Sequence, residues 1–381
     1  MHPRAWLAPF FAHTVLVQVV TFVLRPAAVY RAIELEVPAQ WLGAMGASFA
    51  LVPLLLAVPV GLGTDRFGER RVALVGAGLM MLASAAFLTH GQSLEGLLSA
   101  LILLGTGQLF CAVGQQALVA NRTRWGMHDT AFGHYTLATS AGQAIGPGLL
   151  AFYGRGSTNP DEDSIFLSGL VLTIVLLGIS TLLPATSRRA VGGKESGSVR
   201  TLLRRPGLIQ AITVSCVVLA AVDISLIYLP MLGNERGLAA SVIGMLLACR
   251  AAASMLSRLF LGQLSRLLGR GPLLTTSIAL AVGGIALLPL PLPSWALAVT
   301  VALAGLGLGA GQPLTMSWLA EATPEGLRGR AMSLRITGNH LGQVIVPTAA
   351  GFLAAGAGAA GVLLLTAAAL AAVGVTARGI R

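Results

Sequence analysis

The chain has 381 residues, of which 55% are hydrophobic and only 10% are charged, and its mean hydropathy is +0.81. Soluble domains carry about 25% charged residues, so this composition excludes a soluble protein. The net charge of +11 comes from basic residues in short loops, which favours orientation in a membrane over nucleic-acid binding.

Apolar segments long enough to cross a bilayer recur along the whole chain. A helix needs about twenty apolar residues for this. The sequence predicts twelve spans, at 8–30, 39–62, 72–90, 94–119, 131–153, 164–184, 207–232, 239–264, 272–288, 294–319, 330–354 and 358–377. The polar interval 185–206 predicts a cytoplasmic linker between an N-terminal half, 1–184, and a C-terminal half, 207–381, of six helices each.

A short charged turn joins the second and third predicted spans. Its sequence is Gly61-Leu-Gly-Thr-Asp65-Arg66-Phe-Gly68-Glu-Arg70-Arg71. It resembles the loop between helices two and three of the major facilitator superfamily of transporters, G-x-x-x-D-R-x-G-x-R-R, at every fixed position. The resemblance implies an all-α membrane fold of twelve helices in two pseudo-symmetric halves, and a protein that moves a solute rather than transforming it.

The same resemblance implies a role for the turn as a conformational latch. Asp65 is expected near the cytoplasmic start of helix eleven, where a carboxylate meets exposed N–H groups. Arg66, Arg70 and Arg71 are expected to make charge-assisted contacts that hold the cytoplasmic side shut in one conformer. The alternative is that the arginines only set topology.

The two halves repeat in sequence. At an offset of 200, Gly142-Gln143 aligns with Gly342-Gln343 and Pro147 aligns with Pro347. In the resembled family, two such repeats enclose a substrate site near the membrane midplane. The second-half copy of the charged turn, Gly262-Gln-Leu-Ser-Arg266-Leu-Leu-Gly269, lacks the acid. We therefore expect a lopsided latch carried mostly by Asp65.

The fifth predicted span carries a spaced glycine pattern of Gly133, Gly142 and Gly146-Pro147. It resembles the G-x8-G-x3-G-P core of a motif associated with proton-exchanging exporters, although the family's closing glycine pair is replaced by Leu150 and Ala151. Glycines allow close helix packing, and proline bends a helix. The pattern favours export, and generic packing is the alternative.

Few ionisable residues fall inside the predicted spans, and burying them is costly, so they are candidates for the substrate and proton pathway. Arg25 and Asp223 lie about 8 and 14 Å from the outer helix ends, and we expect them to pair until a proton binds Asp223. The alternative is a permanent ion pair. His340 is a second proton candidate or a core residue. The remaining pathway candidates are Arg250, Arg335 and Asn339.

These features predict a proton-coupled exporter of a small amphiphilic, anionic or zwitterionic molecule, such as a drug-like compound or a metal-chelating metabolite. A symporter importing a nutrient and a non-transporting receptor are the alternatives. No catalytic or metal-ligand spacing is present, so neither an enzyme nor a cofactor is expected. Protons, substrate and lipid are the expected partners of a monomer. By the positive-inside rule, both termini are cytoplasmic in a bacterial-type inner membrane.

Overall fold

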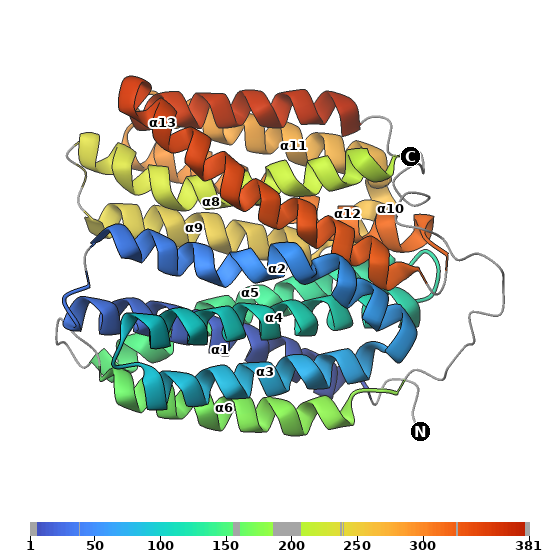
Figure 1. Cartoon of the computed structure of the whole chain (residues 1–381). Helices are drawn as coiled ribbons and strands as arrows, with labels where there is room; N and C mark the ends of the chain where they lie inside the picture. Colours follow the sequence, from blue (N-terminus) through green and yellow to red (C-terminus); the bar gives the residue numbers. More distant parts are fainter. Residues whose placement is uncertain are drawn as a thin grey trace. The chain divides into compact units, whose positions relative to one another are not determined.

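The computed structural model describes residues 6–37, 39–154, 161–185, 207–236, 238, 240–324 and 327–377. The described residues form helices and no strand (Figure 1). This confirms the all-α fold class. Except for Ala185, the predicted linker lies outside the described residues.

The helices follow the predicted spans in chain order. They are α1 (Leu7–Glu34), α2 (Ala39–Phe67), α3 (Glu69–His90), α4 (Leu94–Arg122), α5 (His128–Gly154), α6 (Glu162–Leu182), α8 (Leu208–Glu235), α9 (Ala240–Leu259), α10 (Leu261–Leu268), α11 (Arg270–Leu287), α12 (Ser294–Ala322) and α13 (Arg328–Ala377). The predicted span 239–264 is bent by 61° between α9 and α10. The predicted spans 330–354 and 358–377 both lie in α13. The helix is interrupted between them at Gly358, where φ is 61°.

Within the described residues, nine helices are long and apolar enough to cross a membrane, or ten if α9 and α10 form one bent span. The predicted spans 131–153 and 330–354 are not among them. Both carry several polar residues. The number of twelve spans stays a prediction.

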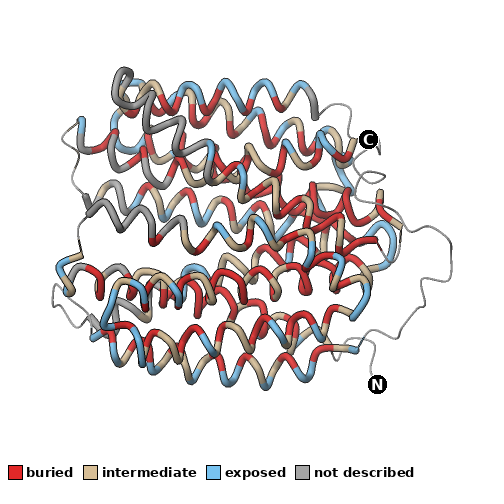
Figure 2. The backbone as a smooth tube through the Cα atoms, in the orientation of Figure 1, coloured by how far each residue is buried: buried red, intermediate tan, exposed pale blue. Residues whose placement is uncertain are grey.

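Side-chain exposure is that of a protein in lipid. Large apolar side chains lie on outward faces, among them Leu55, Leu182 and Leu267, which are 68%, 65% and 81% exposed. Figure 2 shows buried and exposed positions alternating along the helix segments whose burial is described. Such exposure is unfavourable in water but favourable against acyl chains.

By contact, the chain divides into two compact units. Unit 1 comprises Met1–Arg122, Ala138–Ser196 and Pro324–Thr337, and unit 2 comprises Thr123–Leu137, Gly197–Thr323 and Gly338–Arg381. In unit 1, α3 packs on α4 and α6, and Phe87 stacks on Phe166 with ring centroids 5.1 Å apart. In unit 2, α12 packs on α9, α11 and α8. The first turns of α13 belong to unit 1, and the first turns of α5 belong to unit 2.

The sequence repeat recurs in the packing. A Cβ added at Gly105 would collide with the carbonyl of Phe49, and one added at Gly305 would collide with the carbonyl of Arg250. Phe49 and Arg250 are 201 residues apart. Corresponding glycines therefore bring corresponding helices into close approach in each unit.

Loop geometry also repeats. Gly68 and Gly269 have φ of 88° and 80°, a left-handed conformation that favours glycine. They end the two equivalent turns before α3 and α11.

At the start of α6, Asp161 caps the helix by accepting the N–H of Ser164 at 3.1 Å. Its hydrogen bonds from the Ser164 side chain and backbone hold the pKa of Asp161 below its usual range.

Candidate functional site

The charged turn after α2 docks on the first turn of α13, within unit 1. The Asp65 carboxylate accepts the N–H of Gly329 at 2.7 Å and the N–H of Arg330 at 3.1 Å. The Arg330 Nε lies 3.4 Å from the same carboxylate. These N–H groups have no partner inside the helix, and the helix dipole favours a negative charge there. Asp65 therefore lies where the sequence analysis expected it, at the start of the eleventh predicted span, which is the first part of α13. Its role as a latch stays a prediction.

Glycine makes this docking possible. A Cβ at Gly61 would lie 2.8 Å from the carbonyl oxygen of Gly329 and 2.6 Å from the Cβ of Ser333. A Cβ at Gly329 would in turn lie 2.9 Å from the carbonyl oxygen of Gly61. Both positions thus require a residue without a side chain. We refer to Gly61, Asp65, Gly329 and Arg330 as the first-half contact.

The arginines of the turn do not supply the cation of this contact. That cation is Arg330, which comes from α13 itself. Arg66 lies over the ring of Phe67, 5.3 Å from its centroid. Within the described ranges, Arg66, Arg70 and Arg71 form no ion pair with an acid. Their role in a latch stays a prediction.

The second half has its own charged contact, entirely within unit 2. Asp129, in the first turn of α5, accepts hydrogen bonds from Ser265 and from the Arg270 Nε, the latter at 3.1 Å. Arg270 also bonds Glu321 at 2.9 Å, and the His128 Nδ1 lies 3.1 Å from Glu321. We call these five residues the second-half cluster.

The expectation of a lopsided latch stays a prediction, although the second half is not without acids. The turn itself lacks an acid, as the sequence showed, and Arg266 stands where the first half has Asp65. However, Asp129 and Glu321 supply acids from α5 and α12. The sequence held a signal for this, because the offset of 200 aligns Asp129 with Gly329, the residue that Asp65 contacts.

Each half also carries a charged side chain on its first helix that contacts another helix of the same unit. In unit 1, the Arg25 guanidinium lies over the ring of Phe49, 4.1 Å from its centroid. In unit 2, Asp223 accepts a hydrogen bond from Gln343 at 3.1 Å, and its charge acts on the buried Arg250. The predicted pairing of Arg25 with Asp223 joins residues of different units and stays a prediction.

A buried amide cluster forms around Ser215, which lies about two turns before Asp223 on α8. Asn339 accepts the hydroxyl of Ser215 at 2.8 Å and donates to Gln312 at 3.4 Å. Gln312 also donates to the carbonyl of Ser215 at 2.6 Å. The sequence singled out Asn339 but missed Ser215 and Gln312, which come from α8 and α12. Half-buried His340 follows Asn339 in α13 and stays a candidate.

Arg335 has a partner that the sequence did not indicate. It is 2% exposed, and its Nη2 donates to the Gln116 side chain at 2.8 Å. Arg335 and Gln116 both belong to unit 1, whereas Asn339 belongs to unit 2. The predicted shared face of Arg335 and Asn339 therefore serves two separate sets of contacts.

Arg258 stabilises a proline-containing helix. Its Nε donates to the carbonyl of Gly309 at 3.2 Å. Pro313 stands four residues later and has no N–H, so that carbonyl lacks its helical partner. Arg258 supplies the missing donor, which gives it a structural role.

A buried histidine escaped the sequence analysis. The His13 Nδ1 lies 2.8 Å from the Gln115 amide nitrogen, and its Nε2 lies 3.0 Å from the Ser180 hydroxyl. Ser180 donates its own hydrogen to Leu176. Gln115 therefore donates to Nδ1, and a proton on Nε2 is donated to Ser180. Both nitrogens of a neutral imidazole are satisfied, so His13 is a core residue.

The glycines of α5 lie at close helix contacts. A Cβ at Gly142 would lie 2.5 Å from the carbonyl oxygen of Val15, and one at Gly146 would lie 2.8 Å from the Cβ of Phe22. A Cβ at Gly133 would lie 2.7 Å from the carbonyl oxygen of Arg258. The side chain of Pro147 lies outside the described residues. The pattern therefore packs α5 tightly on α1 in unit 1 and on α9 in unit 2.

A family model described as Major Facilitator Superfamily matches residues 10–239 and 211–380. The two matches together span almost the whole chain. The chain belongs to the major facilitator superfamily. As a member of this superfamily, it is a multi-pass membrane transporter rather than an enzyme, and it binds a small-molecule substrate within the bilayer.

Solved structures show the same fold. The chain resembles the human organic anion transporter MFSD10, with a TM-score of 0.82, 16% identity and coverage of 99% of this chain and 100% of that one. It resembles the E. coli fucose:proton symporter FucP, with a TM-score of 0.78, 15% identity and coverage of 99% and 100%. It also resembles a bacterial homologue of the iron transporter ferroportin, with a TM-score of 0.78, 16% identity and coverage of 99% of this chain and 98% of that one. At these identities the likeness concerns the fold alone.

One curated relative is similar in sequence. Multidrug resistance protein 1 of Bacillus subtilis (strain 168) is 29% identical over 150 residues. The match spans 39% of this chain and 38% of that protein. It therefore covers well under half of the relative's length.

Proposed function

We propose that this transporter exports a small amphiphilic, anionic or zwitterionic molecule in exchange for protons, by alternating access. The observation that carries the proposal is the environment of Asp223. This embedded acid accepts an amide hydrogen bond from Gln343, and its charge acts on the buried Arg250. An embedded carboxylate can bind either a proton or a hydrogen-bond donor of a ligand. A proton and a donor group of the substrate would compete for it.

The charge of the substrate decides whether proton and substrate would exclude each other, as in antiport, or bind together, as in symport. A zwitterion would place its cationic group on Asp223 and its anionic group on Arg250, so protonation of Asp223 would expel it. Competition of this kind gives antiport. A substrate with only an anionic group would bind Arg250 more tightly once Asp223 is neutral, so proton and substrate would bind together. That arrangement gives symport, which is the importer alternative. Among the proposed substrates, a zwitterion therefore fits proton exchange best.

Two further observations support export. Gly142 and Gly146 bring α5 against α1 so closely that no side chain fits, as the antiporter-like pattern requires. The curated relative is named as a multidrug resistance protein, which suggests a drug-like substrate class. The first-half contact and the second-half cluster would each hold the cytoplasmic side closed in one conformer.

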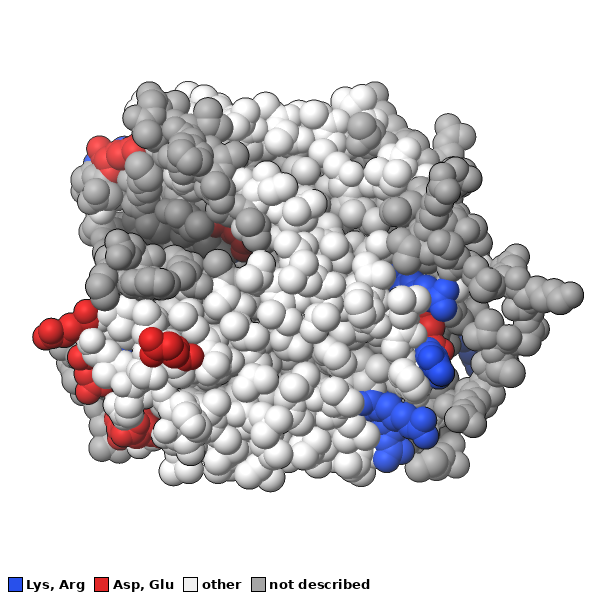
Figure 3. Space-filling view, viewed as in Figure 1, with Lys and Arg blue, Asp and Glu red and all other residues white. Residues whose placement is uncertain are grey.

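The proposed topology places both termini in the cytoplasm of a bacterial-type cell, with a monomer in the inner membrane. In unit 1, Arg66, Arg70 and Arg71 lie at the junction of α2 and α3. The acids Glu34, Asp161 and Asp163 lie at the opposite helix ends. Figure 3 shows basic and acidic side chains at opposite ends of this unit. The positive-inside rule makes the basic end cytoplasmic.

The test uses everted membrane vesicles with a dye that reports the pH gradient. A zwitterionic amphiphile, its N-acylated monoanion and its cationic ester would be added to wild type, to Asp223→Asn and to Arg250→Gln. Thr213→Val, at an exposed position of α8, is the matched control. We expect the zwitterion to release protons in wild type and in the control, and not in the two site variants.

Other outcomes have definite meanings. Proton release by the zwitterion that is unchanged in Asp223→Asn would contradict the role of Asp223. Proton uptake together with the monoanion would establish the symport alternative. Ligand binding without flux in either direction would favour the receptor alternative.

A further inference from the structure

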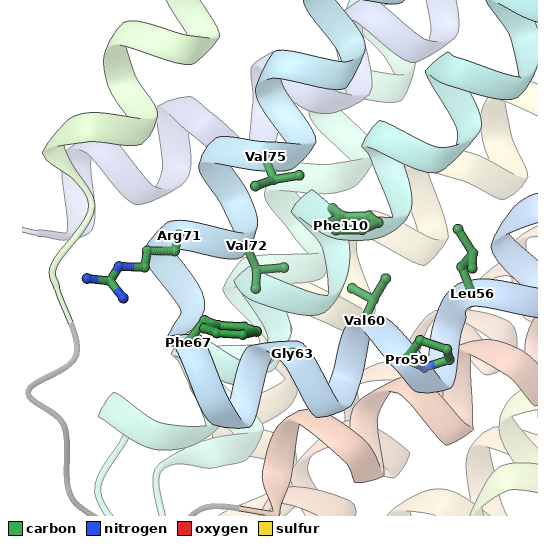
Figure 4. A pocket seen from close by; sticks show the side chains of 9 residues that line it. All are labelled: Leu56, Pro59, Val60, Gly63, Phe67, Arg71, Val72, Val75 and Phe110. Atoms are coloured by element: carbon green, nitrogen blue, oxygen red, sulfur yellow. The ribbon is translucent and has the colours of Figure 1, made fainter.

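An apolar groove of about 450 Å³ lies in unit 1 between α2, α3 and α4 (Figure 4). Its floor is made of Val60 and Val72, which belong to a buried cluster. Its walls include Phe67 and Val75, which are 54% and 51% exposed. The groove therefore opens toward the surroundings of the helices, which for this family is lipid. Its volume falls within the range of small-molecule sites, about 300–1,000 Å³.

The groove has a cationic end. Arg71 is the charged residue among its nine lining residues, and Figure 4 shows it at the opposite end from Leu56. The Arg66 guanidinium lies over the ring of Phe67, which lines the same end. Two guanidinium groups thus stand where the apolar lining stops, at the basic end of unit 1.

No acid neutralises these arginines within the part of the chain that the structure describes. The neighbouring acids are engaged elsewhere. Asp65 accepts the N–H groups of α13, and Glu69 accepts the Asn121 amide at 2.5 Å. The groove end therefore carries net positive charge at the junction between apolar and charged surface.

We propose that this groove binds one acyl chain of an anionic phospholipid, with the lipid phosphate against Arg71 and Arg66. The apolar length accommodates methylene groups, which gain van der Waals contacts with the groove lining. The arginines supply the charge complement for the headgroup, as basic residues do at the cytoplasmic membrane surface. A zwitterionic lipid would fill the same groove but would gain less at its cationic end.

The proposal is tested by native mass spectrometry of the full chain in detergent. The probe is palmitoyl-oleoyl phosphatidylglycerol, compared with the phosphatidylcholine of the same acyl chains. We expect wild type to retain one phosphatidylglycerol, with at least fivefold preference over phosphatidylcholine. Arg71→Gln should lower the phosphatidylglycerol affinity about fivefold, which is the contribution of one basic residue near such a headgroup.

A second variant tests the acyl-chain part independently. A Cβ at Gly63 would meet only Phe67, at 3.9 Å, so Gly63→Leu fits the helix and fills the groove. We expect the affinity to fall at least as far as in Arg71→Gln, because the Leu side chain would occupy the space of the acyl chain and remove its van der Waals contacts. Gly178→Leu is the matched control, since a Cβ there meets nothing within 4 Å and Gly178 lies on α6.

Several results would overturn the proposal. Equal retention of the two lipids, or unchanged affinity in both Arg71→Gln and Gly63→Leu, would each contradict it. Equal loss in Gly63→Leu and Gly178→Leu would show that added bulk acts non-specifically. Displacement of the bound lipid by inorganic phosphate would show a phosphate site without acyl-chain recognition.

Discussion

Replacing Asp65 by Asn should shift the balance between the conformers of this transporter. The carboxylate accepts two backbone N–H groups, at 2.7 and 3.1 Å, and its side chain is only 4% exposed. Asn is nearly isosteric but has one acceptor oxygen, and its NH2 group would face an N–H group. The variant therefore loses one charge-assisted hydrogen bond and the charge at the helix terminus.

The magnitude follows from these two losses. A hydrogen bond to a charged group contributes about 1.5–3 kcal/mol, and a charge at a helix terminus contributes about 0.3–1 kcal/mol. Together they amount to about 2–4 kcal/mol of preference for the conformer that contains the contact. At about 1.4 kcal/mol per tenfold change, the equilibrium should shift by about 30- to 700-fold. A conformer populated at a few per cent would then become dominant.

The assay is a distance measurement between spin labels on the two units. Labels at Leu182→Cys and Leu267→Cys suit it, since these side chains are 65% and 81% exposed. The native cysteines, Cys111, Cys216 and Cys249, would be replaced by Ala. We expect the distance distribution to change in Asp65→Asn and not in Glu95→Gln, an exposed acid on α4. An unchanged distribution in folded Asp65→Asn, with normal transport, would refute the latch role.

Three further predictions follow from neighbouring contacts. Gly61→Ala should shift the same distance distribution at least as far as Asp65→Asn, because its Cβ would lie 2.6 Å from the Cβ of Ser333. Gly78→Ala is the control and should have no effect, because a Cβ there meets nothing within 4 Å. Arg270→Gln should weaken the second-half cluster and lower transport several-fold, since Asp129 and Glu321 both lose their cation, and Arg266→Gln is the control. His13→Ala should destabilise the fold by about 2–4 kcal/mol, because a cavity forms and Gln115 and Ser180 lose a partner. The last effect is measured by thermal unfolding, and a changed number of protons per substrate would contradict the structural role of His13.

The sequence by itself determined the helices, the class of protein and one contact. Apolar length is a local property, so the helix positions could be read directly, and the polar residues at 131–153 and 330–354 mark where that reading is weakest. Asp65 was placed correctly because its motif carries the geometry of a whole family. Gly61 lets α2 approach the start of α13 closely, and Asp65 follows it by four residues. The carboxylate therefore lies against the N–H groups that the helix start leaves without a partner.

Tertiary structure alone decided the partners of the embedded charges. Arg25 contacts Phe49, Arg335 contacts Gln116, and Arg270 joins Asp129 to Glu321. These residues are far apart in the chain, and their types alone do not distinguish one buried partner from another. Which side chains meet depends on how helices rotate and approach, and that is set by packing at glycines and by the break or bend of individual helices. The sequence shows which charged residues lie in the helices, and the packing of the helices determines which side chains they contact.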